Sequence, residues 1–165
     1  MVIALTGFMG SGKTTVGRIV ADALGCPFVD LDEVIVKKAG RSIPDLFATE
    51  GEAGFRTREW QALQETVRKY GEATAVLSLG GGTIIRPEAA RLLQEKALCI
   101  YLRATWETLQ ERLQDPSGGR PLAGEGAADL YRQRLPLYES AAHLTLDTDG
   151  LAPEEVADEI IISCL

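Results

Sequence analysis

Short apolar runs alternate along the chain with longer segments whose apolar residues recur at helical spacing. The apolar runs predict strands at 2–6, 28–30, 75–79, 98–103 and 143–146. The amphipathic segments predict helices at 13–24, 31–39, 50–70, 87–96, 105–114, 127–141 and 153–164. Regular alternation of buried strands with helices is typical of a parallel sheet covered on both faces. We therefore expect an α/β fold with three layers, α/β/α.

Two segments do not fit this scaffold pattern. Residues 40–60 form an insertion after the second strand, and residues 115–126 are rich in glycine and proline. The second segment contains one cation, Arg120. An inert surface loop and a mobile lid over the site are both compatible with this composition, and Arg120 favours the lid.

Composition restricts the possible functions. The chain has 165 residues, of which 45% are hydrophobic and 25% charged, so we expect a single globular domain over 1–165. A net charge of -7 disfavours binding to nucleic acid, and an anionic substrate would need a local arginine cluster.

We expect no membrane span and no secretory signal. The 3 cysteines lack metal-type spacing, which indicates reduced thiols in a cytoplasmic protein. The single histidine, His143, is expected to be structural.

The strongest motif follows the first predicted strand. Gly7-Phe8-Met9-Gly10-Ser11-Gly12-Lys13-Thr14 matches the phosphate-loop pattern G-x-x-x-x-G-K-[ST] and opens the first predicted helix. Glycines allow backbone N–H groups and a helix N-terminus to surround a phosphate chain. Lys13 is expected to reach the β- and γ-phosphates, and the Thr14 hydroxyl is expected to bind Mg²⁺. The sequence therefore predicts a nucleoside triphosphate site.

Two carboxylates follow the second predicted strand, where ligands bind in open parallel sheets. Asp30 and Asp32 could divide the work of phosphoryl transfer, with one acid for Mg²⁺ and the other for the attacking hydroxyl. Either could also cap the helix that follows. Both acids lie about 20 residues beyond the glycine-rich loop, where a dinucleotide-binding fold has the acid that binds the ribose. However, the glycine pattern of that fold, G-x-G-x-x-G, is absent, which argues against an oxidoreductase.

Further candidates for ligand binding are glycines and arginines. Gly80, Gly81 and Gly82 end the third predicted strand, where three successive glycines let a ligand approach the backbone. The candidate anion binders are Arg56, Arg58, Arg112, Arg120, Arg132 and Arg134. Arg134 precedes Pro136 within a predicted helix, where a proline is unusual.

These motifs, in this order, closely resemble those of the shikimate kinase family over essentially the whole chain. The resemblance rests on the phosphate loop and on six further stretches: Asp30-Leu31-Asp32, Gly40-Arg41-Ser42-Ile43-Pro44-Asp45-Leu46-Phe47, Glu50-Gly51-Glu52 through Phe55-Arg56, Leu79-Gly80-Gly81-Gly82, Arg120-Pro121-Leu122 and Arg134-x-Pro136-Leu137-Tyr138. It implies ATP-dependent phosphorylation of the 3-hydroxyl of shikimate. It also implies a five-stranded parallel sheet of order 2-3-1-4-5, a substrate-binding insertion at about 31–60 and a lid at about 115–126.

The resemblance also implies a role for each motif residue. Shikimate would be held by Asp32, Arg56, Gly80, Gly81, Gly82 and Arg134, with the two arginines on its carboxylate. ATP would be bound by Gly10, Ser11, Gly12, Lys13, Thr14, Thr15, Arg112, Arg120 and Pro153. Mg²⁺ would be held by Thr14 and Asp30. The catalytic residues would be Lys13, Asp32 and Arg120. We expect the small molecules ATP and shikimate as substrates, no nucleic acid or membrane partner, and a monomer.

Other readings remain open at this point. The residues do not exclude a kinase of another small acid, such as gluconate, or of a nucleoside monophosphate. A catalytically silent nucleotide-binding protein is a third possibility, although intact Lys13, Asp30, Asp32 and Arg120 argue against it. A GTPase is disfavoured because the guanine motif N-K-x-D is absent.

Overall fold

A parallel sheet forms the centre of the protein. The computed structural model describes residues 1–113 and 126–164. The strands are β1 (Val2–Thr6), β2 (Phe28–Asp30), β3 (Ala75–Ser78), β4 (Ala97–Arg103) and β5 (Leu144–Asp147). They pair in parallel in the order β2-β3-β1-β4-β5. This confirms the predicted fold class and strand order.

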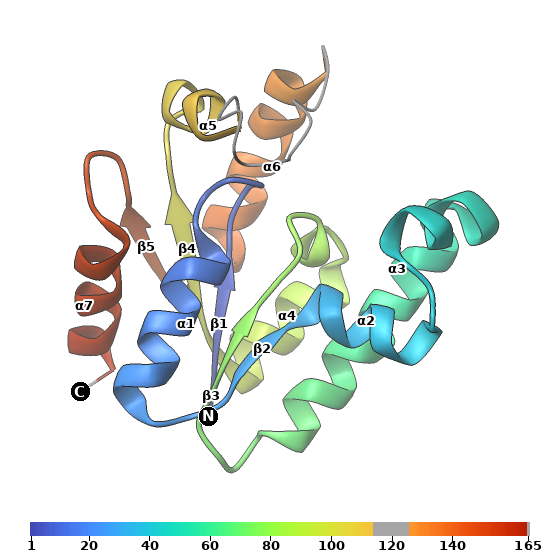
Figure 1. Cartoon of the computed structure of the whole chain (residues 1–165), viewed down its shortest axis with the longest axis horizontal. Coiled ribbons are helices and arrows are strands. Elements are labelled where there is room, and N and C mark those ends of the chain that lie inside the picture. The colour runs from blue at the N-terminus through green and yellow to red at the C-terminus, as the bar shows by residue number, and fades with distance from the viewer. Residues whose placement is uncertain (114–125, 165) are drawn as a thin grey trace.

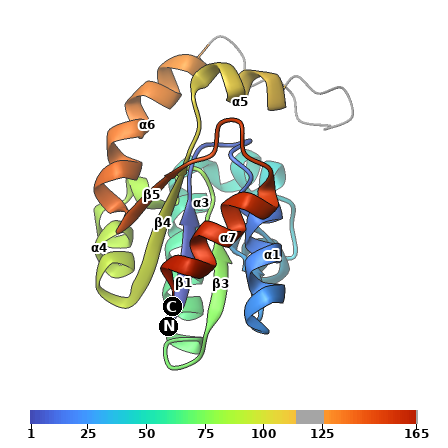
Figure 2. The same ribbon diagram turned by 90° about the vertical axis from the view of Figure 1, so that its left-hand side faces the viewer.

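Helices cover both faces of this sheet (Figures 1 and 2). One face carries α1 (Lys13–Leu24) and α7 (Pro153–Ser163). The other carries α2 (Leu31–Ala39), α3 (Ile43–Lys69), α4 (Pro87–Lys96) and α6 (Ala127–Ala141). A 3-10 turn, η1 (Thr83–Ile85), precedes α4, and α5 (Trp106–Leu113) lies beyond the carboxyl end of β4.

The alternation of side chains along β1 explains the two cores. Ile3 and Leu5 pack with α1 and α7, whereas Val2 and Ala4 pack with the helices of the opposite face. Because successive side chains of a strand point to opposite faces, a strand buried on both sides is apolar throughout. All five residues of β1 are buried, as this arrangement requires.

The structure differs from the sequence prediction mainly in the insertion. The helix predicted at 50–70 begins earlier, at Ile43, after an N-cap at Ser42 whose hydroxyl accepts from Asp45 N (3.3 Å). Gly51 (φ 73°) interrupts the helical backbone, so two helical segments meet there. Glycine adopts this backbone conformation without a steric penalty, which explains a bend at this position. The turn η1 was not predicted.

The expected structural role of His143 agrees with its contacts. Its Nδ1 accepts from Cys99 N (2.9 Å), and its Nε2 lies 3.0 Å from the Gln94 carbonyl oxygen. The ring thus connects the start of β4 to the end of α4. Within 1–113 and 126–164, no helix combines the length and apolarity needed to cross a membrane.

Gly17 permits the close approach of α1 to the sheet and generates a stability prediction. A Cβ added there would lie 2.6 Å from Phe28 Cε1 and 3.3 Å from Leu5 Cδ1. Gly17→Ala should therefore lower the free energy of unfolding by about 1–3 kcal/mol, although alanine is normally the better helix residue. Denaturant unfolding measures this change. The control Asp22→Ala, on the exposed side of α1, should stay within about 0.5 kcal/mol, and an unchanged or stabilised Gly17→Ala would contradict the packing.

Candidate active site

The phosphate loop connects β1 to α1 at the carboxyl edge of the sheet. Gly7, Gly10 and Gly12 all have positive φ angles (152°, 83° and 93°), and Gly12 is the N-cap of α1. This local geometry explains the spacing of the motif, since the loop bends back before α1 begins at Lys13. The Lys13 ammonium donates to the carbonyl oxygens of Gly7 (2.6 Å) and Phe8 (3.1 Å). A positive side chain therefore lies along the loop at the helix N-terminus, which suits an anion.

Asp30 and Asp32 lie at the junction of β2 and α2. Asp30 is the last residue of β2 and the N-cap of α2, and its Oδ1 accepts from Asp32 N (2.9 Å). The capping role considered for this pair therefore belongs to Asp30. Asp32 lies in the first turn of α2, and Lys13 and Arg56 are the cations that act on its charge.

Burial raises the pKa of Asp32 above its ordinary value, and the nearby carboxylates Asp30 and Glu59 raise it further. Lys13 and Arg56 act in the opposite direction, but the net direction remains upward. Desolvation disfavours the charged form of a carboxyl group, so Asp32 is a better proton acceptor than an exposed aspartate.

The three glycines after β3 are each contacted by polar side chains. A Cβ at Gly82 would lie 2.5 Å from Arg56 Nη2, and one at Gly81 would lie 3.4 Å from Arg134 Nη1. A Cβ at Gly80 would lie 3.4 Å from Asp32 Oδ1. None of these glycines has a positive φ angle, so backbone conformation does not demand them. The lack of side chains at these glycines therefore leaves space for the side chains of Asp32, Arg56 and Arg134.

Glu59 is a site residue that the sequence prediction missed. Its carboxylate is buried, and Oε1 accepts from Arg56 Nη1 at 2.9 Å. Its other oxygen accepts from Thr83 Oγ1 at 3.0 Å. These two contacts hold Arg56 of α3 beside η1, immediately after Gly82. An acid three residues after a site arginine on a helix was the available signal.

Arg134 and Tyr138 approach the same glycines from α6. The Tyr138 hydroxyl donates to the Gly81 carbonyl oxygen (2.6 Å), and burial raises the pKa of Tyr138 to about 12. Arg134 Nε is buried and has no hydrogen-bond partner in the described part of the chain. Since buried polar groups are nearly always satisfied, this donor marks a place for an acceptor. Tyr138 was part of a quoted motif but had received no role.

A pocket adjoins the phosphate loop beside α7. It is lined by Ser11, Gly12, Thr15, Val16, Arg112, Thr148, Leu151, Pro153 and Val156. Arg112 also donates to the Gly10 carbonyl oxygen (3.2 Å). The structure therefore brings Arg112 and Pro153 to one pocket beside Ser11, Gly12 and Thr15, although these two residues had the weakest sequence support.

The described residues thus form two groups that meet at the phosphate loop. Asp32, Arg56 and Arg134 surround Gly80–Gly82, and Lys13 of the phosphate loop acts on the charge of Asp32. Arg112 lines two pockets with phosphate-loop residues, and Pro153 lines one of them. Arg58 instead pairs with Glu50 (2.8 Å), and Arg132 pairs with Asp129 (3.1 Å), so these candidates form surface ion pairs. Arg120 and the lid segment up to 125 lie outside the described residues.

The fold and the phosphate loop define the class of the protein, a phosphate-loop α/β protein of the small-molecule kinase type. The family model "Shikimate kinase" matches residues 9–165. A shikimate kinase from Enterococcus faecalis is 44% identical over 164 residues, which cover 96% of this chain and 95% of that protein. The chain belongs to the shikimate kinase family.

Solved structures agree with this assignment. A shikimate kinase from Acinetobacter baumannii in complex with shikimate has a TM-score of 0.88 and 36% identity, and the match covers 99% of this chain and 92% of that chain. A gluconokinase from Sinorhizobium meliloti has a TM-score of 0.65 at 19% identity, covering 98% of this chain and 89% of that chain. The second likeness concerns the fold alone.

The Arg56–Glu59 pair generates a prediction on stability. Removing one member of a buried ion pair leaves the other charge uncompensated, so Glu59→Ala should lower the free energy of unfolding by about 2–4 kcal/mol. Glu52 is the matched control, because it also pairs with Arg56 (3.8 Å) but is 75% exposed. Glu52→Ala should change stability by less than about 0.5 kcal/mol. Equal effects of the two substitutions in denaturant unfolding would show that burial of Glu59 is unimportant.

Proposed function

We propose that this protein transfers the γ-phosphoryl group of ATP to the 3-hydroxyl of shikimate, giving shikimate 3-phosphate. The phosphates of ATP lie along the phosphate loop, and the base lies between Arg112 and Pro153. The shikimate carboxylate binds to Arg56 and Arg134 beside Gly80–Gly82, and the reacting hydroxyl donates to Asp32. Family membership supports the reaction, and the position of each residue supports its role.

One observation carries the acceptor assignment. Two arginines from different helices approach adjacent glycines, and one of them has a buried Nε with no acceptor in the described part of the chain. A planar carboxylate satisfies guanidinium groups with short, charge-assisted hydrogen bonds. Asp32 Oδ1 lies beside Gly80 of the same stretch, and its charge suits a hydroxyl donor. The arrangement therefore fits a small ligand that carries both a carboxylate and a hydroxyl.

The chemistry depends mainly on position and charge. Phosphoryl transfer spreads negative charge over the γ-phosphoryl oxygens, and a fixed cation stabilises that charge. Lys13 supplies this cation within the described residues, and we assign the same role to Arg120 in the lid. Asp32 orients the hydroxyl and accepts its proton as the bond to phosphorus forms. Its raised pKa favours this acceptance.

The residues also fit a magnesium ion. Mg²⁺ prefers a few protein oxygen ligands and fills its other positions with water and phosphate oxygens. Thr14 offers a hydroxyl in the first turn of α1, and Asp30 offers a carboxylate at the end of β2. When bound, the ion neutralises charge on the β- and γ-phosphates. Thr14 and Asp30 hold and orient it through oxygen atoms.

All proposed contacts come from one chain, so a monomer suffices for the reaction. We place the protein in the cytoplasm, because ATP is supplied there and the free thiols of Cys26, Cys99 and Cys164 stay reduced.

A panel of acceptors tests this function. Shikimate, gluconate and AMP are each supplied with ATP and Mg²⁺, and ADP formation is followed in a coupled assay. We expect turnover with shikimate to exceed the other two by at least about a hundredfold, because a site whose buried polar groups pair with one substrate rejects analogues that leave those groups unpaired. Comparable turnover with gluconate, or none with any acceptor while ATP still binds, would contradict the proposal.

The arginines should separate binding of the acceptor from binding of the nucleotide. Arg134→Ala removes charge-assisted hydrogen bonds worth about 1.5–3 kcal/mol each, so shikimate affinity should fall at least about tenfold. Affinity for ADP should be nearly unchanged. Arg56→Ala should weaken shikimate similarly but also destabilise the fold, because Glu59 then loses its partner. Calorimetric titration and thermal unfolding measure both quantities, and unchanged shikimate affinity in both variants would locate the carboxylate elsewhere.

The raised pKa of Asp32 predicts a pH dependence of both activity and stability. Turnover should rise with pH through an apparent pKa above the usual value of about 3.9, because the reaction needs the ionised form. Folding favours the protonated form of Asp32, so its cost in stability begins as the pH rises above the unfolded pKa and is complete above the folded pKa. Asp32→Asn should therefore raise the melting temperature at neutral pH, and this gain should vanish below the unfolded pKa. A lower melting temperature at neutral pH would contradict the sign of the shift.

The two aspartates should differ in their dependence on magnesium. Asp30→Asn keeps an acceptor oxygen for the N–H of Asp32, so the fold should persist while the Mg²⁺ concentration for half-maximal activity rises several-fold. Asp32→Asn should lower kcat strongly and leave that concentration unchanged. Titration of activity with Mg²⁺ distinguishes the variants. Parallel magnesium curves would show that the two carboxylates share a role.

A further inference from the structure

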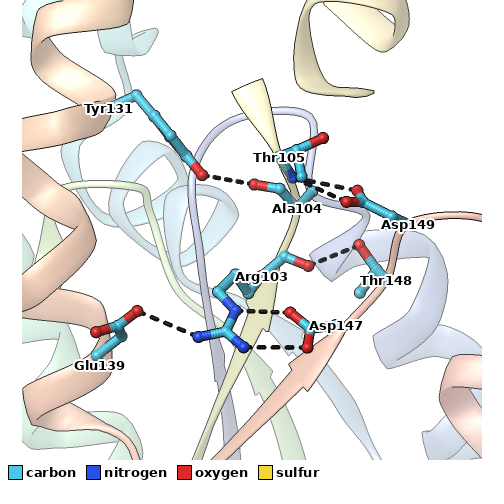
Figure 3. A network of polar contacts seen from close by, with 8 residues as sticks. All are labelled: Arg103, Ala104, Thr105, Tyr131, Glu139, Asp147, Thr148 and Asp149. Carbon is cyan, nitrogen blue, oxygen red and sulfur yellow. Dashed lines mark hydrogen bonds and ion pairs between the residues drawn. The ribbon is translucent and has the colours of Figure 1, made fainter. Parts of the chain in front are cut away.

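The carboxyl end of β4 is bonded to the loop between β5 and α7 (Figure 3). The Arg103 carbonyl oxygen accepts from Thr148 N (2.8 Å) and from Thr148 Oγ1 (3.1 Å). The Arg103 guanidinium donates to both oxygens of Asp147, at 2.6 and 3.0 Å. The loop therefore starts from a fixed point, because its first residues are bonded through both backbone and side chain.

Asp149 extends this connection to α5. Both oxygens of its carboxylate accept from Thr105 N, at 3.1 and 3.3 Å. Thr105 precedes α5 and caps it, since its carbonyl oxygen accepts from Leu109 N (3.0 Å) and its hydroxyl from Thr108 N (3.3 Å). Figure 3 shows the Asp149 side chain pointing across to the backbone of Thr105. Asp149 thus bonds the loop directly to the capping residue of α5.

These two elements line one pocket beside the phosphate loop. The loop supplies Thr148, Leu151 and Pro153, and α5 supplies Arg112 near its other end. Gly150 has a positive φ angle (72°), and Leu151 N donates to the Thr148 carbonyl oxygen (3.2 Å), so the loop turns immediately after Asp149. Arg112 is also bonded to the Gly10 carbonyl oxygen (3.2 Å), and α5 has only 8 residues, so a shift of its first turn changes how Arg112 lies relative to Leu151 and Pro153.

We propose that Asp149 is a positioning residue for the nucleotide base: it fixes α5, and through α5 Arg112, relative to the loop that carries Pro153. This inference rests on the proposed function in taking the pocket as the base site. Asp149 itself is exposed and does not line the pocket, so it acts through these two elements. Without the bonds from Asp149 to Thr105 N, α5 and the loop between β5 and α7 adopt other relative positions for part of the time. The apparent affinity for the nucleotide then falls in proportion to the fraction of molecules in the binding conformation.

Calorimetric titration with ADP and with tripolyphosphate separates the base from the phosphates. Asp149→Ala should raise the dissociation constant for ADP about three- to tenfold and change that for tripolyphosphate less than twofold. Asp149→Asn keeps an amide oxygen that accepts from Thr105 N, so it should restore most of the ADP affinity. Asp158→Ala, an exposed acid on α7, is the matched control and should bind both ligands normally.

A double-mutant cycle with Arg112 tests the route of the effect. If Asp149 acts by placing Arg112, then Asp149→Ala should weaken ADP much less in an Arg112→Ala background than in the wild-type protein. Full additivity of the two substitutions would overturn the proposed route. An Asp149→Ala variant with a lower melting temperature but unchanged ADP affinity would show that Asp149 has only a structural role.

Arg112 also faces the phosphate loop, so equal weakening of ADP and tripolyphosphate would show that Asp149 acts on the phosphates and not on the base, and would overturn the proposal. The titrations use nucleotide alone, without shikimate. A wild-type protein that binds ADP but does not phosphorylate shikimate would therefore contradict the proposed function. The titrations of the Asp149 variants would still decide whether Asp149 positions the base site.

Discussion

The proposed acceptor site depends above all on the lack of a side chain at Gly82. An added Cβ there would lie 2.5 Å from Arg56 Nη2, and Arg56 is bonded to the buried Glu59 carboxylate, so it could not move aside without losing that bond. At Gly80 and Gly81 the nearest side-chain atoms would lie 3.2 and 3.4 Å from an added Cβ, which calls for small shifts at most. These three glycines follow β3, which lies between β2 and β1 in the sheet, and side chains from α2, α3 and α6 pack closely around them.

Charge in this site is balanced over short distances. The protein carries a net charge of -7, and both proposed substrates are anions. Local cations make binding possible: Lys13 lies on the phosphate loop, and Arg56 and Arg134 lie at the triglycine. Glu59 compensates Arg56 where it is buried, whereas Arg134 retains an unsatisfied Nε within the described structure. Arg56 thus has a protein carboxylate as a partner, whereas the buried Arg134 Nε is a donor that the proposed shikimate carboxylate would satisfy.

The sequence was sufficient for the parts of the fold that depend on local pattern. Apolar runs located the strands, and the phosphate-loop motif located the turn into α1, because each is defined by neighbouring residues. The helix that begins at Ile43 was missed in part, since Gly51 interrupts the pattern there. Glu59 was missed although its partner Arg56 is only 3 residues away on α3. Thr83 and Asp149 were missed for another reason, because their partners lie far along the chain: Thr83 is 24 residues from Glu59, and Asp149 is 44 residues from Thr105. Only the folded sheet edge brings such residues together.

Transfer of phosphate to the 3-hydroxyl of shikimate can be observed directly by proton-coupled ³¹P nuclear magnetic resonance of the protein with ATP, Mg²⁺ and shikimate. We expect a new phosphate monoester signal coupled to the proton on carbon 3 of shikimate, growing in step with ADP. Release of inorganic phosphate without an ester signal, or an ester coupled to a different ring proton, would contradict it.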